Sequence, residues 1–286
     1  MPGRTATGAS RTRHDMCPGV LRPWIAEDGA LVRLRLVGGR LPVEALGGLL
    51  EVAAAYGDGD VNLTKRANLQ LRSMPQQDGA LPQHVVDALA ATGLLPSPSH
   101  ELVRNIMVSP ASGLSEGRVD LRPVAEELDL RICADPTLAG LPGRFLFVLD
   151  DGRGDLVDRS CDLGLAAMDG HTAQVRIGSA GWGPVVTLDE AALVLVSLGR
   201  LFLRVRGEGP TAAWHVDELD DLAEVRDRRV PAPTGPLAFG AGPAGTHIEV
   251  PGGRLTPQLA EPLLPSRRDL VVTPWYGVLV PHGEDQ

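Results

Sequence analysis

The sequence is poor in aromatic residues and cysteines, and it has no long apolar run. Aromatic residues make up only 3% of the 286 residues, so the core must consist mainly of leucine, valine and alanine. Cys17, Cys133 and Cys161 show no CxxC spacing, which argues against a disulfide framework or a metal site built from these thiols alone. No apolar run reaches the roughly 20 residues that cross a bilayer, and residues 1–15 lack the apolar stretch of a secretory signal. We therefore expect a cytoplasmic protein.

The chain carries a negative net charge. A net charge of −9 argues against a general nucleic-acid binder, and we expect neither nucleic acid nor a membrane as partner. An anionic ligand would need a local cluster of arginines that opposes this overall field. The length of the chain suits two or three domains.

A weak internal repeat predicts how these domains are arranged. The string GGRL at 38–41 recurs at 252–255, and each copy follows an extended apolar segment and precedes a helix and a further strand. The residues between the copies have a different composition, with helical apolar periods and a buried strand at 145–149. We therefore predict a disordered tail at 1–15, a first half at 16–80, a middle α/β domain at 81–230, a linker at 231–236 and a second half at 237–286.

The segment at 61–72 predicts a binding surface. Read as one strand with a period of two, it places apolar side chains and Lys65 on one face. From alternation alone, the other face could simply be solvated. That face contains no acid, however, and the arginine fork matches carboxylates and phosphates in bidentate fashion. We predict that it binds a polyanionic, partly flat ligand through Asn62, Thr64, Arg66, Asn68, Gln70 and Arg72.

Other polar residues have two possible interpretations. Arg104 and Asn105 precede a turn, and Arg144 precedes the buried strand; each arginine could add to the site or could pair with a surface acid. For Arg33 and Arg35, which alternate with apolar residues, we favour a solvated face. The acidic loop is more typical of a solvated turn than of a metal site; it contains Asp150, Asp151, Asp155 and Asp158.

Several strings of this sequence resemble nitrite and sulfite reductases, and most closely the precorrin-3B synthase branch of that family. The resemblance extends from about residue 16 to residue 283, and its most specific string is LT-x-R-x-N-x-Q at 63–70. The strings that carry it are CPGVLRPW at 17–24, YGDGDVNLTKRANLQLR at 56–72, RNIMVSP at 104–110, LPGRFLFVLDDG at 141–152, PGGRL at 251–255 and LVVTPW at 270–275. The resemblance implies an α+β fold in which two ferredoxin-like half-domains flank one nitrite/sulfite reductase-type α/β domain.

The resemblance also implies a sirohaem or tetrapyrrole ligand. Arg66 matches the family's anion- and sirohaem-contacting arginine, Arg104 a second such arginine with Asn105 beside it, and Arg144 a basic residue of the substrate pocket. Sulfite reductases place a further lysine where this chain has Leu146, which disfavours sulfite or nitrite as substrate. The residues that would line the macrocycle's carboxylates are Thr64, Asn68, Gln70 and Arg72.

The family's [4Fe–4S] cluster has no counterpart among these cysteines. It is held by four cysteines spaced C-x5-C and C-x3-C, whereas this chain ends at Gln286 without such a spacing. We therefore expect this chain to lack the iron–sulfur half. The metal centre would then come from a separate chain or a homodimer, or it would be absent from the protein altogether.

Two classes of function follow from the resemblance. The first is a precorrin-3B synthase-like oxidoreductase of cobalamin biosynthesis, whose parent reaction is an oxygen-dependent hydroxylation of precorrin-3A. The second is a non-catalytic tetrapyrrole-binding module. A sulfite or nitrite reductase-like fragment is a third reading, which Leu146 and the missing cluster disfavour.

Overall fold

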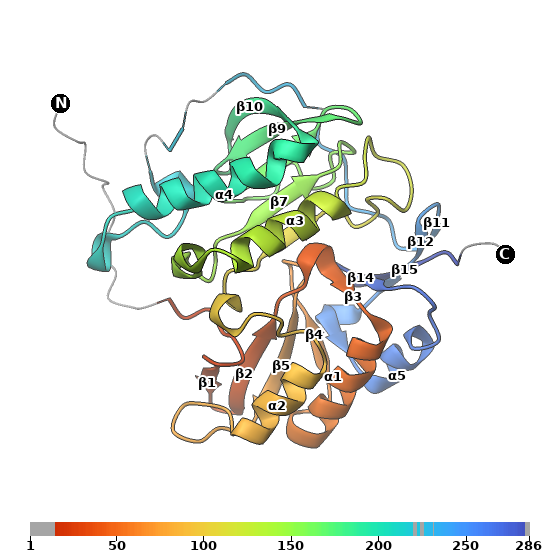
Figure 1. Ribbon diagram of the computed structural model, residues 1–286. Helices are drawn as coiled ribbons and strands as arrows, with labels where there is room; N and C mark the ends of the chain where they lie inside the picture. The colour runs from red at the N-terminus through yellow and green to blue at the C-terminus, as the bar shows by residue number, and fades with distance from the viewer. Residues whose placement is uncertain (1–14, 220–221, 224–225, 231, 284–286) are drawn as a thin grey trace.

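The computed structural model describes residues 15–219, 222–223, 226–230 and 232–283, in an arrangement of three five-stranded sheets and five α-helices (Figure 1). Residues 1–14 of the predicted tail and residue 231 of the predicted linker lie outside these ranges. Within them, no helix is both long enough and apolar enough to cross a membrane.

The first half is a sheet covered on one face by two helices. Strand order is β1-β2-β5-β4-β13, and all neighbours are antiparallel. Alternation places Val32, Leu34, Leu69 and Leu71 in the core beneath the helices. The elements are β1 (Trp24–Ala26), β2 (Gly29–Leu34), α1 (Val43–Tyr56), β4 (Val61–Leu63), β5 (Leu69–Met74) and α2 (Gln83–Ala91).

Helix α2 belongs to this first half and not to the middle domain in which the predicted boundary at residue 80 had placed it. Its buried residues Val85 and Leu89 lie in the same hydrophobic core as Leu46 and Leu49 of α1. The two apolar stripes pack on each other, so the first half extends past residue 91.

The second half repeats this plan with shorter elements. Its strand order is β11-β12-β15-β14-β3, again antiparallel. The elements are β11 (Gly240–Gly242), β12 (Gly245–Glu249), α5 (Pro257–Ala260), β14 (Leu270–Thr273) and β15 (Gly277–Pro281).

The two GGRL strings exchange strands between the halves. In β3 (Arg40–Leu41), Arg40 pairs with Val271 of the second half, and in β13 (Arg254–Leu255), Arg254 pairs with Asn62 of the first half. Each string starts with two glycines in the left-handed region, at φ 60° and 73° in the first copy and 63° and 75° in the second. The predicted internal repeat is therefore confirmed, and each half completes the other's sheet.

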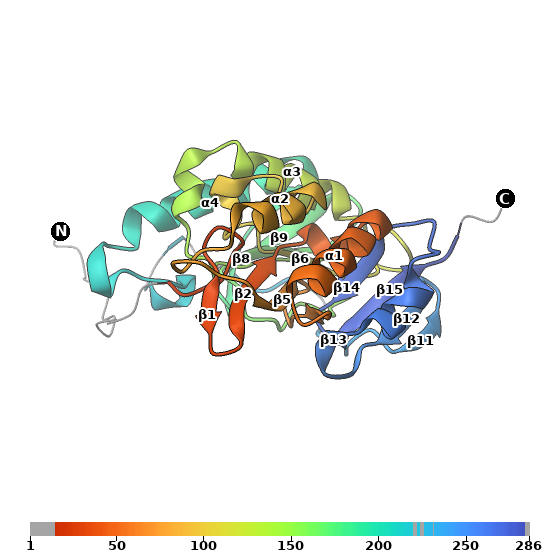
Figure 2. The ribbon, with the colours of Figure 1, turned by 90° about the horizontal axis from the view of Figure 1, so that it is seen from below.

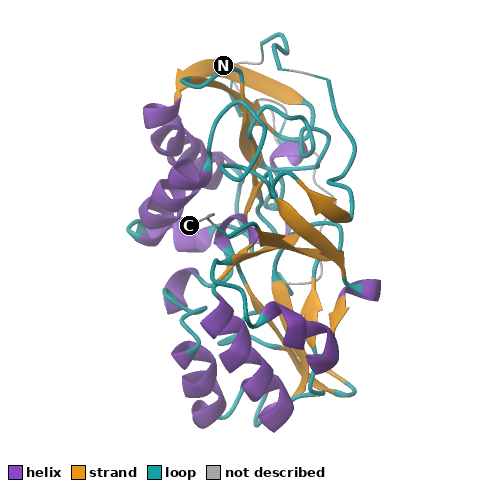
Figure 3. Cartoon of the chain, turned by 90° about the vertical axis from the view of Figure 1, so that its right-hand side faces the viewer, coloured by secondary structure: helices purple, strands orange, loops and turns teal. Residues whose placement is uncertain are grey.

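The middle domain is a mixed sheet with helices on one face. The order is β10-β9-β8-β7-β6, with β6, β7 and β8 parallel and the remaining pairs antiparallel. The long helices of the molecule lie together on one side and the sheets on the other (Figures 2 and 3). The elements are β6 (Ile106–Val108), α3 (Arg122–Cys133), β7 (Phe147–Asp150), β8 (Leu163–Ala167), β9 (Thr172–Ile177), β10 (Gly181–Thr187) and α4 (Leu188–Val205).

Candidate anion-binding site

Residues 61–72 form a hairpin, so the prediction of one continuous strand was wrong. Strands β4 and β5 pair with each other, Asn62 opposite Gln70, and residues 64–68 make the turn between them. The Thr64 Oγ1 accepts hydrogen bonds from the N–H groups of Arg66 and Asn68, at 3.3 and 3.1 Å, and Ala67 adopts φ 54°. The side chains predicted for one face are therefore divided between two strands and a turn, and Arg66 lies in that turn.

Four arginines from three places in the chain meet beside this turn. Arg66 donates from Nη1 to the carbonyl oxygen of Arg144, at 2.7 Å. Burial lowers the pKa of Arg66, and the positive charge of Arg144 lowers it further. Burial likewise lowers the pKa of Arg33, with Arg66 adding to the effect. We call Arg33, Arg35, Arg66 and Arg144 the arginine cluster.

The outer arginines of the cluster make no direct ion pair within the described residues, although Asp162 lies close enough to Arg66 to raise its pKa. Among the residues that the structure describes, no carboxylate lies within ion-pair distance of Arg33, Arg66 or Arg144. Arg144 is exposed, but Arg33 and Arg66 are partly buried, and partly buried cations that repel each other are costly without a partner. The arrangement is therefore suited to bind an anion with more than one negative group.

Two buried donors beside the cluster have no acceptor. Arg33 Nη2 donates to Gln70 Oε1 at 2.8 Å, but neither Arg33 Nε nor Asn62 Nδ2 has a hydrogen-bond partner in the described part of the chain. The three side chains form a row across the sheet, because Gln70 pairs with both Arg33 and Asn62. Buried donors are normally paired, so this row fits a ligand that supplies acceptor oxygens, as the carboxylates of a tetrapyrrole would.

Arg35 supports the cluster from inside the protein. Its side chain is 3% exposed and donates to Asn105 Oδ1 at 3.1 Å, to the Pro18 carbonyl at 3.1 Å and to the Gly143 carbonyl at 3.4 Å. Burial, reinforced by Arg33, lowers its pKa to about 10. The interpretation of Arg33 and Arg35 as a solvated face was therefore wrong, because the segments around Pro18 and Gly143 cover the end of β2. Arg33 and Arg35 alternate with apolar residues on a face that contains no acid. The same sequence pattern had led us to predict Arg66 as a ligand-binding residue.

Asn68 and Asn105, both predicted to bind the ligand, are instead buried and bonded within the protein. Asn68 accepts from the Leu36 N–H at 2.9 Å and donates to Asn105 Oδ1 at 3.2 Å. Asn105 Nδ2 in turn donates to the carbonyls of Leu102 and Gly143, both at 3.0 Å. With these contacts satisfied, the two amides join the first half to the middle domain and position Arg35.

Arg104 and Arg72 do not reach the cluster. Arg104 is buried and makes a bidentate ion pair with Asp129 of α3, with both N–O distances at 2.7 Å. The Arg72 side chain is 47% exposed, and Asp28 lies 3.6 Å away. Arg104 matches the alternative interpretation of an arginine paired with an acid, and Arg72 matches that of a solvated face, so Arg66 and Arg144 are the predicted cations that the structure brings together.

The described residues do not fit a [4Fe–4S] cluster. Cys17 lies beside Gly143 near the arginine cluster, Cys133 ends α3, and Cys161 is fully buried, where burial raises its pKa to about 12. Within the described ranges, no group of three or more histidine, cysteine or acidic side chains could hold a metal ion. Leu146 is buried in an apolar cluster with Met107, Val148 and Trp275.

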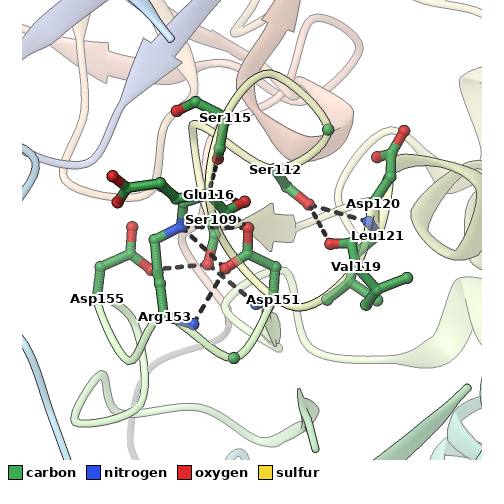
Figure 4. A network of polar contacts seen from close by, with 12 residues as sticks. Ser109, Ser112, Ser115, Glu116, Val119, Asp120, Leu121, Asp151, Arg153 and Asp155 are labelled. Carbon is green, nitrogen blue, oxygen red and sulfur yellow. Dashed lines mark hydrogen bonds and ion pairs between the residues drawn. The ribbon is translucent and has the colours of Figure 1, made fainter. Parts of the chain in front are cut away.

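The acidic loop after β7 is buried, so the prediction of a solvated turn was wrong except for Asp158. Asp150 accepts from the N–H groups of Gly152 and Gly154, both at 2.9 Å, which folds the loop around its carboxylate. Asp151 pairs with Arg153 at 2.8 Å, and Ser109 donates to Asp155 at 2.7 Å (Figure 4). Burial, reinforced by the charge of Asp150, raises the pKa of Asp155 to about 7 against the lowering effect of the Ser109 hydrogen bond.

Asp155→Asn should stabilise the fold at alkaline pH. Between about pH 4 and 7 the folded protein keeps a proton on Asp155 that the unfolded chain has lost, so Asp155 makes stability fall as pH rises through this window. The neutral amide removes this penalty and can still accept from Ser109. We expect a gain of about 1–2 kcal/mol near pH 8 and little change near pH 4, measured by urea unfolding. The exposed Asp158→Asn is the control, and an equal gain at both pH values would contradict the account.

Known proteins of the nitrite/sulfite reductase type are similar to parts of this chain. Residues 25–78 match the family model for the nitrite/sulfite reductase ferredoxin-like half domain. A precorrin-3B synthase from a Sinorhizobium species is 30% identical over 156 residues, which cover 53% of this chain and 32% of that protein. A ferredoxin–nitrite reductase from Synechococcus elongatus is 31% identical over 130 residues, which cover 43% of this chain and 25% of that protein. The matched region therefore spans a third or less of these relatives.

A solved structure shares the fold over almost the whole chain. The Mycobacterium tuberculosis NirA protein superposes with a TM-score of 0.66 and 16% identity, covering 97% of this chain and 58% of that one. At this identity the likeness concerns the fold alone. Together with the matching half domain, it confirms the predicted α+β class of the nitrite/sulfite reductase type.

Proposed function

We propose that this chain, whose residues 25–78 form a nitrite/sulfite reductase ferredoxin-like half domain, holds a tetrapyrrole by its carboxylates in a precorrin-3B synthase-like reaction of cobalamin biosynthesis. One observation carries the proposal. Arg33, Arg66 and Arg144 converge with no carboxylate at ion-pair distance in the described residues, beside the unpaired donors Arg33 Nε and Asn62 Nδ2. A rigid macrocycle with several carboxylates can satisfy these groups together.

The residues of this chain would bind and orient the ligand. Arg66 and Arg144 offer charge-assisted hydrogen bonds to one side of the macrocycle, and Arg33 with Asn62 offers donors along the sheet. Gln70 holds the Arg33 side chain, and Arg35 and Asn105 hold the backbone at Gly143 beside Arg144, which limits the ordering cost of binding. When bound, a sirohaem iron would supply the electron-transfer chemistry.

The environment of Leu146 supports a precorrin type of substrate over sulfite or nitrite. A lysine at this position would place an ammonium group among Met107, Val148 and Trp275. The buried leucine removes one of the cations that the family's sulfite reductases place near their small anion. The remaining cations are spaced over two hairpins and a strand end, which suits a large ligand.

A second candidate function is a non-catalytic tetrapyrrole-binding module. The observation that favours it is the separation of the three free cysteines. Within the described residues, no set of thiols lies close enough together to ligate a cluster. If the protein is instead an enzyme, the cluster would come from a separate chain that carries the iron–sulfur half.

The proposal is tested by titrating the anaerobically purified chain with sirohaem and recording the Soret band. We expect saturation at one equivalent, and weaker binding of protohaem, which has fewer carboxylates. Acid-labile sulfide and oxygen-dependent turnover of precorrin-3A would then separate the enzyme from the binding module. A chain that ignores sirohaem and precorrin-3A alike would overturn both candidates.

A further inference from the structure

A cavity of about 560 Å³ lies where the two halves and the middle domain meet. The first half contributes the GGRL turn, the middle domain contributes the loop after β6 and the start of α3, and the second half contributes residues 267–271. Its apolar walls include Leu36, Val108, Leu114 and Val271. The volume lies in the range that holds small organic ligands, and such sites favour domain junctions.

The cavity is cationic although the chain as a whole is acidic. Six arginines line it against one glutamate and one aspartate, and two of them, Arg104 and Arg122, pair with aspartates outside the lining. Arg40 is bound by both of these acids, Glu126 and Asp269. Arg268 donates only to the His282 carbonyl, at 3.2 Å, and Arg267 is exposed; in the described ranges neither has a carboxylate partner. Two guanidiniums therefore remain available for an anion at the rim.

The position of the cavity also favours an anion. Ser109, Pro110 and Ser112 follow the carboxyl end of the parallel strand β6, where open α/β sheets commonly bind ligands. Arg122 is the first residue of α3, whose amino end adds positive potential. The buried Arg35 is shared with the arginine cluster, but Arg33, Arg66 and Arg144 do not line the cavity, and Arg144 precedes the amino end of the neighbouring strand β7.

We propose that this cavity binds an organic anion with an apolar body and one carboxylate or phosphate head, which Arg267 and Arg268 receive. The apolar body contacts Leu36, Val108, Leu114 and Val271, and the ligand thereby touches all three parts of the fold. Binding stabilises the packing of the two halves against the middle domain, because a ligand that binds only the assembled form shifts the equilibrium toward it. This site does not depend on the tetrapyrrole proposal.

The probe is 8-anilinonaphthalene-1-sulfonate, an organic anion with an aromatic body whose fluorescence rises in apolar sites. We expect saturable binding of one equivalent to the full chain, and weaker binding of neutral N-phenyl-1-naphthylamine. The double variant Arg267→Ser/Arg268→Ser should weaken binding of the anion about tenfold or more, because two charge-assisted contacts are lost. The matched control is Arg131→Ser/Arg204→Ser, two exposed arginines at other sites, which should leave the affinity unchanged.

A cavity-filling variant tests the location independently. Leu114→Trp should abolish binding of the probe while the chain still unfolds cooperatively. Decanoate and decyl phosphate should displace the probe, whereas decanol should not. The anion that displaces it at the lower concentration identifies the preferred head group. The proposal is overturned if neither anion displaces the probe, if the Arg267/Arg268 variant binds it normally, or if Arg66→Ala weakens its binding equally.

Discussion

Replacing Arg66 by alanine is expected to weaken sirohaem binding by on the order of a hundredfold. Arg66 is the arginine of the β4–β5 turn, and unlike the exposed Lys65 it is partly shielded from water beside Arg144. Truncating one partner of a desolvated charge pair commonly costs this much, because the carboxylate left behind keeps its desolvation penalty. The affinity is measured from the Soret band as the apoprotein is titrated.

Arg72→Ala is the matched control for this prediction. Arg72 lies on the same hairpin and has the same charge, but its side chain is 47% exposed and faces Asp28. We expect its loss to change the affinity by no more than about twofold. If Arg72→Ala weakened binding as much as Arg66→Ala, the ligand would follow the predicted continuous strand and not the arginine cluster.

Gly39→Ala is expected to prevent stable folding. Gly39 has φ 73°, and a Cβ at this position would overlap the Val272 carbonyl oxygen on β14. That contact lies where the halves exchange strands, so relief of the overlap would pull β3 away from its partner sheet. We expect a loss of about 4 kcal/mol or more in the free energy of unfolding, measured by urea denaturation.

Gly252→Ala isolates the backbone contribution to that loss. Gly252 is a glycine of the second GGRL copy with φ 63°, but no atom lies within 4 Å of the position its Cβ would take. Its replacement should cost only the left-handed conformation, about 1–2 kcal/mol. Equal losses at the two glycines would show that the close approach at Gly39 contributes nothing.

The sequence predicted the plan of the fold because repetition is a local signal. The two GGRL strings, each between an extended segment and a helix, were sufficient to predict two related halves around a middle domain. They could not show that Arg40 pairs with Val271 or that Arg254 pairs with Asn62. This exchange is set by long-range pairing, which no single segment encodes.

The same limit explains the errors at the candidate site. A period of two continues through residues 64–68, so alternation could not reveal the turn at Ala67. It could also say that Arg33 and Arg35 share a face, but not that the segments around Pro18 and Gly143 cover Arg35. Arg66 and Arg144 lie side by side in the structure, but the sequence alone had offered Arg144 only as a possible addition to the site, because it precedes a buried strand.

Comparing sirohaem with its methyl ester tests the central claim most directly. Esterification removes the negative charges of the ligand but keeps the macrocycle and its iron. If the arginine cluster recognises carboxylates, the acid should bind at least about a hundredfold more tightly than the ester, and Arg66→Ala should weaken the acid without affecting the ester. Equal affinities for acid and ester, with Arg66→Ala making no difference to either, would contradict carboxylate recognition by this cluster.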